Sequence, residues 1–346
     1  MKTERMAMFS FLIAAVLTAA ILSLFWHKSG FSIYTVKPTY EISEITAKSE
    51  QSNLEQEKSY VQLLFVGDIM FDRGIRYYAG KNGLPAMPAH AGQAGGNEFI
   101  FDKISPTLLG NDLVVANLEG PITDNKSVSA GTAIGSANNY FFTFDPSWAK
   151  TLFQENIRLV DLGNNHILNF GKAGVDSTEK YLDNAGVDYF GAPSGDKSII
   201  KNIGGVKIAF VSYNQFLSSN IADEQKATIA EIEKIKSEAD IVVVFSHWGI
   251  EYQSLINPPE ESLARQFIDA GADLVVGSHP HVIGPIEIYK GKRIYYSLGN
   301  FIFDQYFNED VRNGLGVVVK IDKATKQLDF SEQKFYLQNN GQTLLR

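Results

Sequence analysis

Residues 64–70 read LFVGDIM, a short apolar run that ends in a glycine and a carboxylate, Asp68. An apolar run followed by polar side chains able to bind a metal recurs four more times along the chain. The other runs read VVANLEGP (114–121), VDLGNNH (160–166), VVFSHWG (243–249) and VVGSHPH (275–281). Near-continuous apolar runs of this length are typical of strands buried on both faces. The pattern predicts an α/β fold whose strand ends carry the functional side chains.

Amphipathic stretches separate several of these runs and are expected to be helices. They cover residues 146–155, 171–185, 223–239 and 259–270. Toward the C-terminus the pattern changes to paired strands, at 286–289 with 293–297 and at 315–321 with 328–336. No repeat or break in composition divides residues 60–346, so we expect one domain there. Its two long loops, 79–97 and 124–139, are expected to be lids or binding loops.

The first 28 residues resemble a membrane anchor. Residues 6–26 are apolar except for two serines and a threonine, and as a helix they would span about 31 Å, close to the thickness of a bilayer core. Lys2 and Arg5 form the positive flank expected in the cytoplasm. No small-x-small site follows, which favours an uncleaved signal anchor over a cleaved signal peptide or a buried soluble helix. Residues 29–59 would then be a polar stalk, and the domain would lie on the extracytoplasmic side of the cell membrane as part of a single-pass protein.

The composition restricts the chemistry available to the chain. It has 346 residues, no cysteine, six histidines and a formal net charge of −8. The absence of cysteine excludes disulfide scaffolds, thiol nucleophiles and cysteine-bound zinc, so any metal must be bound by His, Asp, Glu or Asn. The acidic balance, with no basic cluster, argues against a nucleic-acid partner. Four of the histidines, at 166, 247, 279 and 281, fall in the five runs above.

Each polar residue at a strand end also has an ordinary structural explanation. Asp68 and Glu119 could be turn or cap residues, residues 164–165 could be turn formers, and His247 could be a core histidine. Residues 279–281, His-Pro-His, give the strongest single signal, because two imidazoles in an extended segment stiffened by proline can reach adjacent metals. Five such strand ends are improbable by chance. The set therefore predicts a site for a divalent metal: Mn, Zn, Fe or Mg.

Six ordered motifs extend this pattern: GDIM, NLE, NNH, HWGIEY, GSHPH and YSLGNFIFD, the last at residues 296–304. Together they resemble the CapA/PgsA family of poly-γ-glutamate capsule synthesis proteins, over about residues 61–305. That family is similar in fold to the calcineurin-like metallophosphoesterases. The resemblance therefore implies a four-layer α/β/β/α sandwich with a two-metal site, preceded here by one N-terminal transmembrane helix.

The resemblance also implies roles for individual residues. One metal would be bound by Asp68, Glu119 and His281, and the other by Glu119, Asn165, His247 and His279. Met70 stands where the superfamily has a histidine ligand, so one or two ions would bind, with the second site tighter. His166 would be the general acid or would stabilise developing charge. Weaker substrate contacts are expected from Arg73, Asn117, Asn164, Glu251 and Asn300. For Arg73, anion binding and an ordinary surface charge are both open.

Two functions are compatible with these residues. The first is a metal-dependent hydrolase of phosphoesters or amides that serves the synthesis or export of poly-γ-glutamate or another envelope polymer. The second is a non-catalytic accessory subunit of a polymer synthase or export complex, whose metal is structural or binds the anionic polymer. The expected partners are the membrane, membrane-bound synthase subunits, and an anionic polymer or a phosphorylated or amide substrate. A domain this acidic is a poor receptor for polyglutamate unless it contains a local basic pocket.

Overall fold

The run that opens the sequence pattern lies in β1 (Tyr60–Ile69), the central strand of the larger of two sheets in a computed structural model. The structure describes residues 58–80, 96–218 and 220–346, all within one unit, Lys58–Arg346. The predicted transmembrane helix, 6–26, and nearly all of the predicted stalk lie outside the described residues. Among the residues described, no helix is both long and apolar enough to span a membrane.

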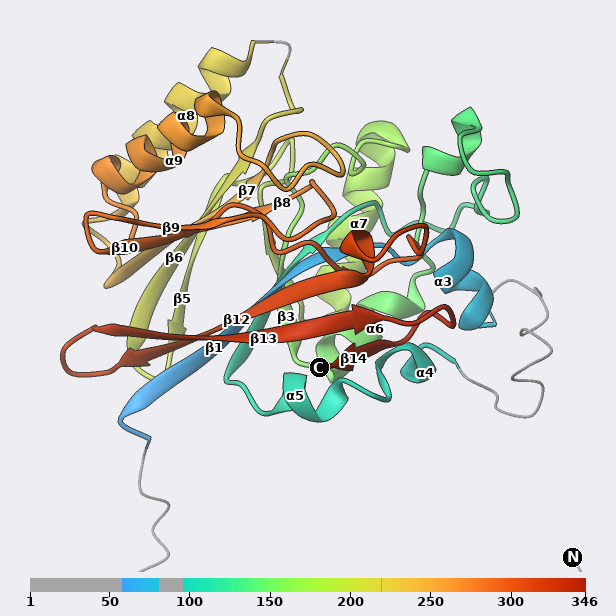
Figure 1. The fold of residues 1–346 in the computed structure, drawn as a ribbon, viewed down its shortest axis with the longest axis horizontal. Helices are drawn as coiled ribbons and strands as arrows, with labels where there is room; N and C mark the ends of the chain where they lie inside the picture. The colour runs from blue at the N-terminus through green and yellow to red at the C-terminus, as the bar shows by residue number, and fades with distance from the viewer. Residues whose placement is uncertain (1–57, 81–95, 219) are drawn as a thin grey trace, which may run out of the picture. The chain divides into compact units, whose positions relative to one another are not determined.

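The larger sheet has eight strands in the order β14-β13-β12-β1-β2-β3-β4, with β11 also paired to β1 (Figure 1). Besides β1 they are β2 (Leu113–Leu118), β3 (Ile157–Asp161), β4 (Asp188–Phe190), β11 (Asn300–Ile302), β12 (Asn313–Asp322), β13 (Leu328–Leu337) and β14 (Thr343–Leu345). β1 to β4 and β11 run parallel, whereas β12, β13 and β14 form an antiparallel extension. The parallel part brings the carboxyl ends of β1, β2 and β3 to one edge.

The smaller sheet has six strands in the order β5-β6-β7-β8-β10-β9. They are β5 (Ser198–Ile203), β6 (Val206–Asn214), β7 (Ile241–His247), β8 (Leu274–Ser278), β9 (Ile286–Tyr289) and β10 (Lys292–Tyr295). β6, β7, β8 and β10 are parallel to one another. Their carboxyl ends therefore also share one edge, and β5 and β9 pair antiparallel at the two borders.

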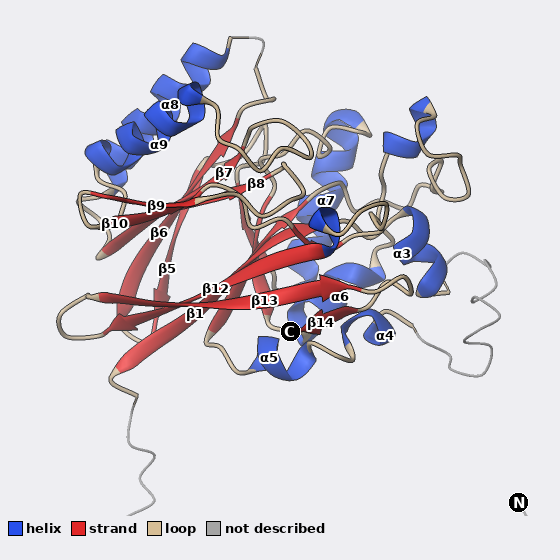
Figure 2. Ribbon diagram, in the orientation of Figure 1, coloured by secondary structure: helices blue, strands red, loops and turns tan. Residues whose placement is uncertain are grey.

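Helices cover the outer face of each sheet (Figure 2). The longer ones are α6 (Ser147–Gln154), α7 (Gly171–Ala185), α8 (Ile221–Ile235) and α9 (Pro258–Ala270). The shorter ones are α3 (Arg73–Tyr78), α4 (Glu98–Phe101), α5 (Ser105–Leu109), η3 (Ala137–Tyr140) and η4 (Asp310–Arg312). α6 and α7 pack on the larger sheet, and α8 and α9 pack on the smaller one.

Successive side chains of each strand point to opposite faces of its sheet, and this alternation produces the layers. On β1, Leu63 and Phe65 belong to the core between the two sheets, whereas Leu64 and Val66 pack with the helices on the other face. Both faces of the strand are buried, which explains why its sequence is apolar without interruption. The layers run helix, sheet, sheet, helix, and the structure confirms the predicted α/β class with two packed sheets.

Residues 296–300 link the two sheets at the edge where the parallel strands end. Leu298 N donates to Gly277 O (2.9 Å) on β8, and Asp68 N on β1 donates to Gly299 O (3.1 Å). A Cβ atom on Gly67 would lie 1.8 Å from Gly299 O, and one on Gly277 would lie 2.0 Å from Tyr296 O. Glycine at these two positions therefore lets the segment pass close enough to hold both strand ends together.

Asp161 is a buried carboxyl group at the end of β3, and it makes stability depend on pH. Burial raises its pKa to about 7, although Gly163 N donates to its Oδ1 (2.9 Å). The pKa in the unfolded chain is about 3.9, so the stabilisation by the protonated form is fully present below pH 4 and is lost as pH rises to about 7. Between pH 5 and pH 8 we expect the free energy of unfolding of the wild type to fall by about 3 kcal/mol as Asp161 ionises, and that of Asp161→Asn not to show this fall. Urea unfolding at both pH values measures the difference. An equal loss in wild type and variant would contradict this assignment.

Candidate metal centre

Five ionisable side chains from both sheets converge at the edge where the strands end. Asp68 lies at the end of β1, Glu119 directly follows β2, and His247 ends β7. His279 and His281 follow β8. All five residues are at most 4% exposed. Their convergence follows from the topology, because parallel strands of two packed sheets end at the same edge.

The side chains form two groups that share one carboxylate. The first group is Asp68, Glu119 and His281, and the second group is Glu119, His247 and His279. Within each group the possible ligand atoms all lie within 4.8 Å of one another. His281 Nδ1 lies 3.1 Å from Asp68 Oδ2, and His281 Nε2 lies 3.6 Å from Glu119 Oε1. Glu119 is therefore placed to bridge two ions.

Asn165 adds an amide oxygen to the second group, because its Oδ1 lies 2.9 Å from His247 Nε2. The second group thus has four candidate donors and the first group has three. Met70 belongs to neither group: its side chain is fully buried in the core beneath α6 and α7. Its sulfur accepts a hydrogen bond from Asp72 N (2.9 Å).

The chemistry of these donors fits a divalent cation. Glu119 Oε1 and His279 Nδ1 are buried and have no hydrogen-bond partner among residues 58–80, 96–218 and 220–346. Unpaired polar atoms at such depth are costly, and a bound cation would satisfy both. Burial, together with the charges of Asp68 and Glu251, raises the pKa of Glu119. Carboxylate, imidazole and amide donors suit Mn, Zn, Fe or Mg.

His247 and His279 are uncharged, which is the form that binds metals. Burial lowers the pKa of His247 far below its usual range, and the neighbouring imidazoles lower it further. Burial likewise lowers the pKa of His279 to about 3. Their nitrogen lone pairs are therefore available at neutral pH.

The segment 279–281 has a strained backbone. His279 has φ of 94° and His281 has φ of 58°, values that residues other than glycine rarely adopt. His279 N donates to Asp68 Oδ2 (3.3 Å), and Tyr252 N donates to Pro280 O (2.8 Å). In a regular strand, residues two apart point to the same face of the sheet. The strained backbone instead places the imidazole of His279 in one ligand group and that of His281 in the other.

Three asparagines that are expected to contact substrate also support the ligands. Asn117 Nδ2 donates to Asp68 Oδ1 (2.8 Å) and lies 3.2 Å from His247 Nδ1. Asn164 Nδ2 donates to Asn117 Oδ1 (3.1 Å). Asn300 Oδ1 lies 3.0 Å from His281 Nδ1. All three are at most 3% exposed, and the contacts that they make position the ligands. Their contact with a substrate stays a prediction.

His166 and Glu251 lie beside the two groups. His166 Nε2 is 3.9 Å from Glu119 Oε1, and His166 Nδ1 is 3.2 Å from Asn169 Oδ1. Burial lowers the pKa of His166 to about 4, so its ring is neutral near pH 7. Glu251 is half-buried and close enough to Glu119 for its charge to raise the pKa of that carboxyl.

Arg73 is enclosed and paired, which excludes the alternative of an ordinary surface charge. Its Nη2 pairs with Asp304, and its Nη1 donates to Asn139 Oδ1 (3.3 Å). Its guanidinium carbon lies 5.0 Å from the ring centre of Phe142 and 5.4 Å from that of Phe303. Asp304 is the last residue of the motif at 296–304, and this motif is the sequence signal that could have identified it as a functional residue. Phe142 has no local signal, because only the folded chain brings it to Arg73.

A sequence model of a known family matches this chain. The family is described as bacterial capsule synthesis protein PGA_cap, and the match spans residues 62–305. The chain is 28% identical over 310 residues to the capsule biosynthesis protein CapA of Bacillus anthracis, covering 84% of this chain and 67% of that protein. It is 32% identical over 256 residues to the PGA biosynthesis protein CapA of Bacillus subtilis strain 168, covering 70% and 63%. The chain thus spans about two thirds of the length of these relatives.

Among solved structures, the chain is similar to TT1561 of Thermus thermophilus, with a TM-score of 0.37, 10% identity, and coverage of 79% of this chain and 98% of that one. The fold follows from the chain's own strands and helices. The match at residues 62–305 includes every residue of both ligand groups and well over half of the 346 residues. On this basis the chain belongs to the bacterial capsule synthesis protein family PGA_cap.

Proposed function

We propose that this protein is a metal-dependent hydrolase of phosphoesters or amides, with a metallophosphoesterase-type centre, that serves the synthesis or export of a capsule polymer. The observation that carries the proposal is the pair of donor groups that share Glu119. Two adjacent divalent ions would supply Lewis-acid polarisation of the scissile group and would lower the pKa of an attacking water. Asn117 and Asn300 hold the ligand side chains in place for this purpose.

His166 is the residue placed to move a proton. Asn169 Oδ1 accepts a hydrogen bond from Phe142 N (2.7 Å), which identifies that atom as the amide oxygen. An oxygen acceptor 3.2 Å from His166 Nδ1 fixes the ring proton on Nδ1. Nε2, which lies 3.9 Å from Glu119 Oε1, would then accept the proton of the attacking water and donate it to the leaving group. His166 therefore begins the reaction as an acceptor and acts as an acid only after that step.

The setting of this activity is also part of the proposal. Residues 6–26 would anchor the chain in the cell membrane as a single-pass protein, with the domain on the extracytoplasmic side. There it would lie beside membrane-bound polymer synthase subunits and act on an anionic polymer or on a phosphorylated or amide precursor. The names of the two Bacillus relatives, capsule biosynthesis protein and PGA biosynthesis protein, support a role in this pathway.

A metal titration followed by a hydrolysis assay tests the proposal. Full-length protein in detergent micelles is stripped with a chelator and titrated with Mn²⁺ or Zn²⁺ in a calorimeter. We expect two binding steps, the tighter one at the second group because Asn165 gives it a fourth donor. The loaded protein should hydrolyse an aryl phosphate or a γ-glutamyl amide, and the stripped protein should not. Metal binding without hydrolysis of either class would contradict the enzymatic role.

The burial of the ligands favours one second candidate, a non-catalytic accessory subunit with a structural metal. All five ionisable ligands are at most 4% exposed, whereas a catalytic ion needs an open position. Complementation of a capsule-deficient strain separates the two functions. The variant is His166→Ala, which removes the proposed proton carrier and leaves both ligand groups intact. If it accumulates normally but fails to restore polymer export, the hydrolase is supported, and if it restores export, the accessory role is supported.

A further inference from the structure

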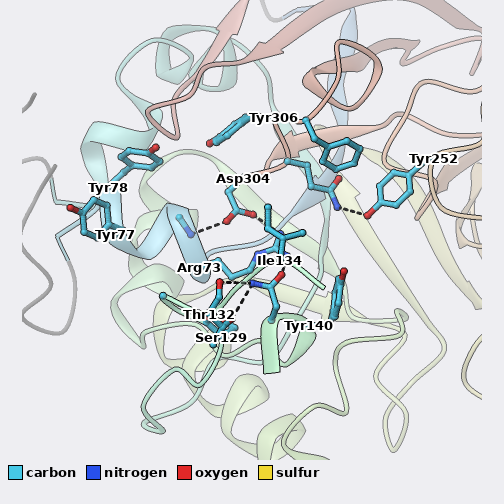
Figure 3. Close-up of a pocket in the computed structure, with 15 residues that line it drawn as sticks. Arg73, Tyr77, Tyr78, Ser129, Thr132, Ile134, Tyr140, Tyr252, Asp304 and Tyr306 are labelled. Carbon is cyan, nitrogen blue, oxygen red and sulfur yellow. Dashed lines mark hydrogen bonds and ion pairs between the residues drawn. The ribbon is translucent and has the colours of Figure 1, made fainter. Parts of the chain in front are cut away.

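A cavity of about 590 Å³ opens beside the metal centre, within the usual size range of small-molecule sites. We call it the tyrosine pocket, after Tyr77, Tyr78, Tyr140, Tyr252 and Tyr306, which line it. Figure 3 shows Tyr77 and Tyr78 on one side of the pair formed by Arg73 and Asp304, with Tyr140 and Tyr252 on the other. The loop at 124–139, expected to be a binding loop, supplies part of the wall.

The tyrosine pocket shares a wall with the metal centre. Arg73, at the pocket, lies over the rings of Phe142 and Phe303. The ring centre of Phe142 is 4.3 Å from that of His166, and the ring centre of Phe303 is 4.8 Å from that of His281. Tyr252 also borders the centre, with its ring 6.0 Å from that of His281. A ligand in the pocket would therefore lie next to a group held at the metals.

The lining of the pocket carries no net charge. Arg73 and Asp304 are its two charged residues, and they pair with each other. Burial raises the pKa of Tyr78, so its hydroxyl stays protonated. A chain with a carboxylate on every unit would meet Asp304 and find no unpaired cation among these residues. The pocket is thus unsuited to polyglutamate and suited to a neutral group.

The tyrosines offer flat apolar faces with polar edges. Tyr140 is 43% exposed and Tyr252 is 40% exposed, so both rings have faces open to a ligand. Within the described part of the chain, no hydrogen bond engages the hydroxyl of Tyr77, Tyr78 or Tyr140, whereas Tyr252 Oη accepts one from Gln305 Nε2 (3.1 Å). Rings with free hydroxyls match a ligand that has apolar C–H faces and a rim of hydroxyl groups.

We propose that the tyrosine pocket binds a neutral saccharide ring of the substrate, while the group to be hydrolysed lies at the metal centre. The assignment to a substrate rests on the proposed hydrolase function, but the binding of the ring does not. The substrate is then a glycan or a sugar-linked phosphoester or amide, and not a bare polyglutamate chain.

Calorimetry on chelator-treated, full-length protein tests the binding directly, without activity as a readout. The probes are oligosaccharides of glucose and of N-acetylglucosamine, with a γ-glutamyl oligomer as the anionic comparison. We expect at least one saccharide to bind and the γ-glutamyl oligomer to bind more weakly. Tyr140→Ala should weaken saccharide binding about five- to tenfold, and Tyr140→Phe, which keeps the ring, should weaken it less. Tyr289→Ala, on β9 of the other sheet, is the matched control and should change nothing.

The remaining outcomes either overturn the saccharide site or separate it from the hydrolase function. No saccharide binding, binding that Tyr140→Ala leaves unchanged, or tighter binding of the γ-glutamyl oligomer would overturn the proposal. An unchanged melting temperature of Tyr140→Ala shows that the variant is folded, as expected for a half-exposed side chain. If saccharide binding depends on Tyr140 but the metal-loaded protein hydrolyses nothing, the saccharide site is supported and the hydrolase function is contradicted. If the metal-loaded protein hydrolyses a substrate but binds no saccharide, the hydrolase function is supported and the saccharide site is contradicted.

Discussion

Glu119→Gln is expected to abolish metal binding at both groups and, with it, metal-dependent hydrolysis. Glu119 is the one residue common to both groups, and its Oε1 is a buried oxygen without a hydrogen-bond partner among the described residues. Glutamine keeps the shape but removes the charge that a divalent ion requires. Changes to residues that merely support ligands cost about 10- to 100-fold in affinity, so loss of a shared ligand should exceed about 100-fold. Calorimetric titration with Mn²⁺ measures the effect.

The melting temperature distinguishes this effect from unfolding. Without metal, Glu119 is a fully buried carboxyl beside Asp68, and burial disfavours its charged form. Metal-free Glu119→Gln should therefore be at least as stable as the metal-free wild type, yet gain no stability from Mn²⁺. Glu155→Gln, at another buried glutamate that lies outside both groups, is the matched control and should keep the metal-induced rise. Wild-type Mn²⁺ affinity in Glu119→Gln would refute a shared ligand.

Arg76→Met is expected to destabilise the protein by about 3–5 kcal/mol. Arg76 is 1% exposed and its Nε lies 2.9 Å from Oδ1 of Asp72, which is fully buried. Asp72 Oδ2 accepts a hydrogen bond from Thr143 N (2.8 Å), and Arg76 also donates to Thr143 O. The variant would leave the Asp72 carboxylate buried without a cation, which is the costly outcome for a buried ion pair. Urea unfolding at pH 7 measures the loss.

Two further variants test the cause of this loss. Arg76→Met combined with Asp72→Asn should recover part of the stability, because the unpaired charge is gone. Lys172→Met breaks the exposed pair between Lys172 and Asp176, whose side chains are 73% and 51% exposed, and should have little or no effect. Equal losses in the buried and exposed pairs would show that burial does not set the cost.

The strand ends could be predicted from the sequence because their pattern is local. An apolar run that stops at a polar residue marks the end of a buried strand, and parallel strands place such ends together. For this reason the sequence alone is enough to expect Asp68, Glu119 and His247 in one place. The pattern does not show which strand end faces which. The division of His279 and His281 between two groups therefore came from the family resemblance.

The supporting residues could not be predicted, because their roles depend on contacts between distant segments. Asn117 seemed available to a substrate, yet in the fold it lies between Asp68 and His247 from the other sheet. The tyrosine pocket combines α3, the loop at 124–139 and residues 304–307. No periodicity in the sequence relates these segments, so their juxtaposition appears only in three dimensions.

The residues that converge on the metal centre come from positions 68, 119, 165, 247, 279 and 281, and so from most of the length of the domain. While the chain is being made, the last two donors emerge some 210 residues after the first. An ion that needs the full set can be acquired only after residue 281 has been made and both sheets have assembled. The bound metal would then be set by the ions present where the chain finishes folding, and not by those present where its synthesis begins.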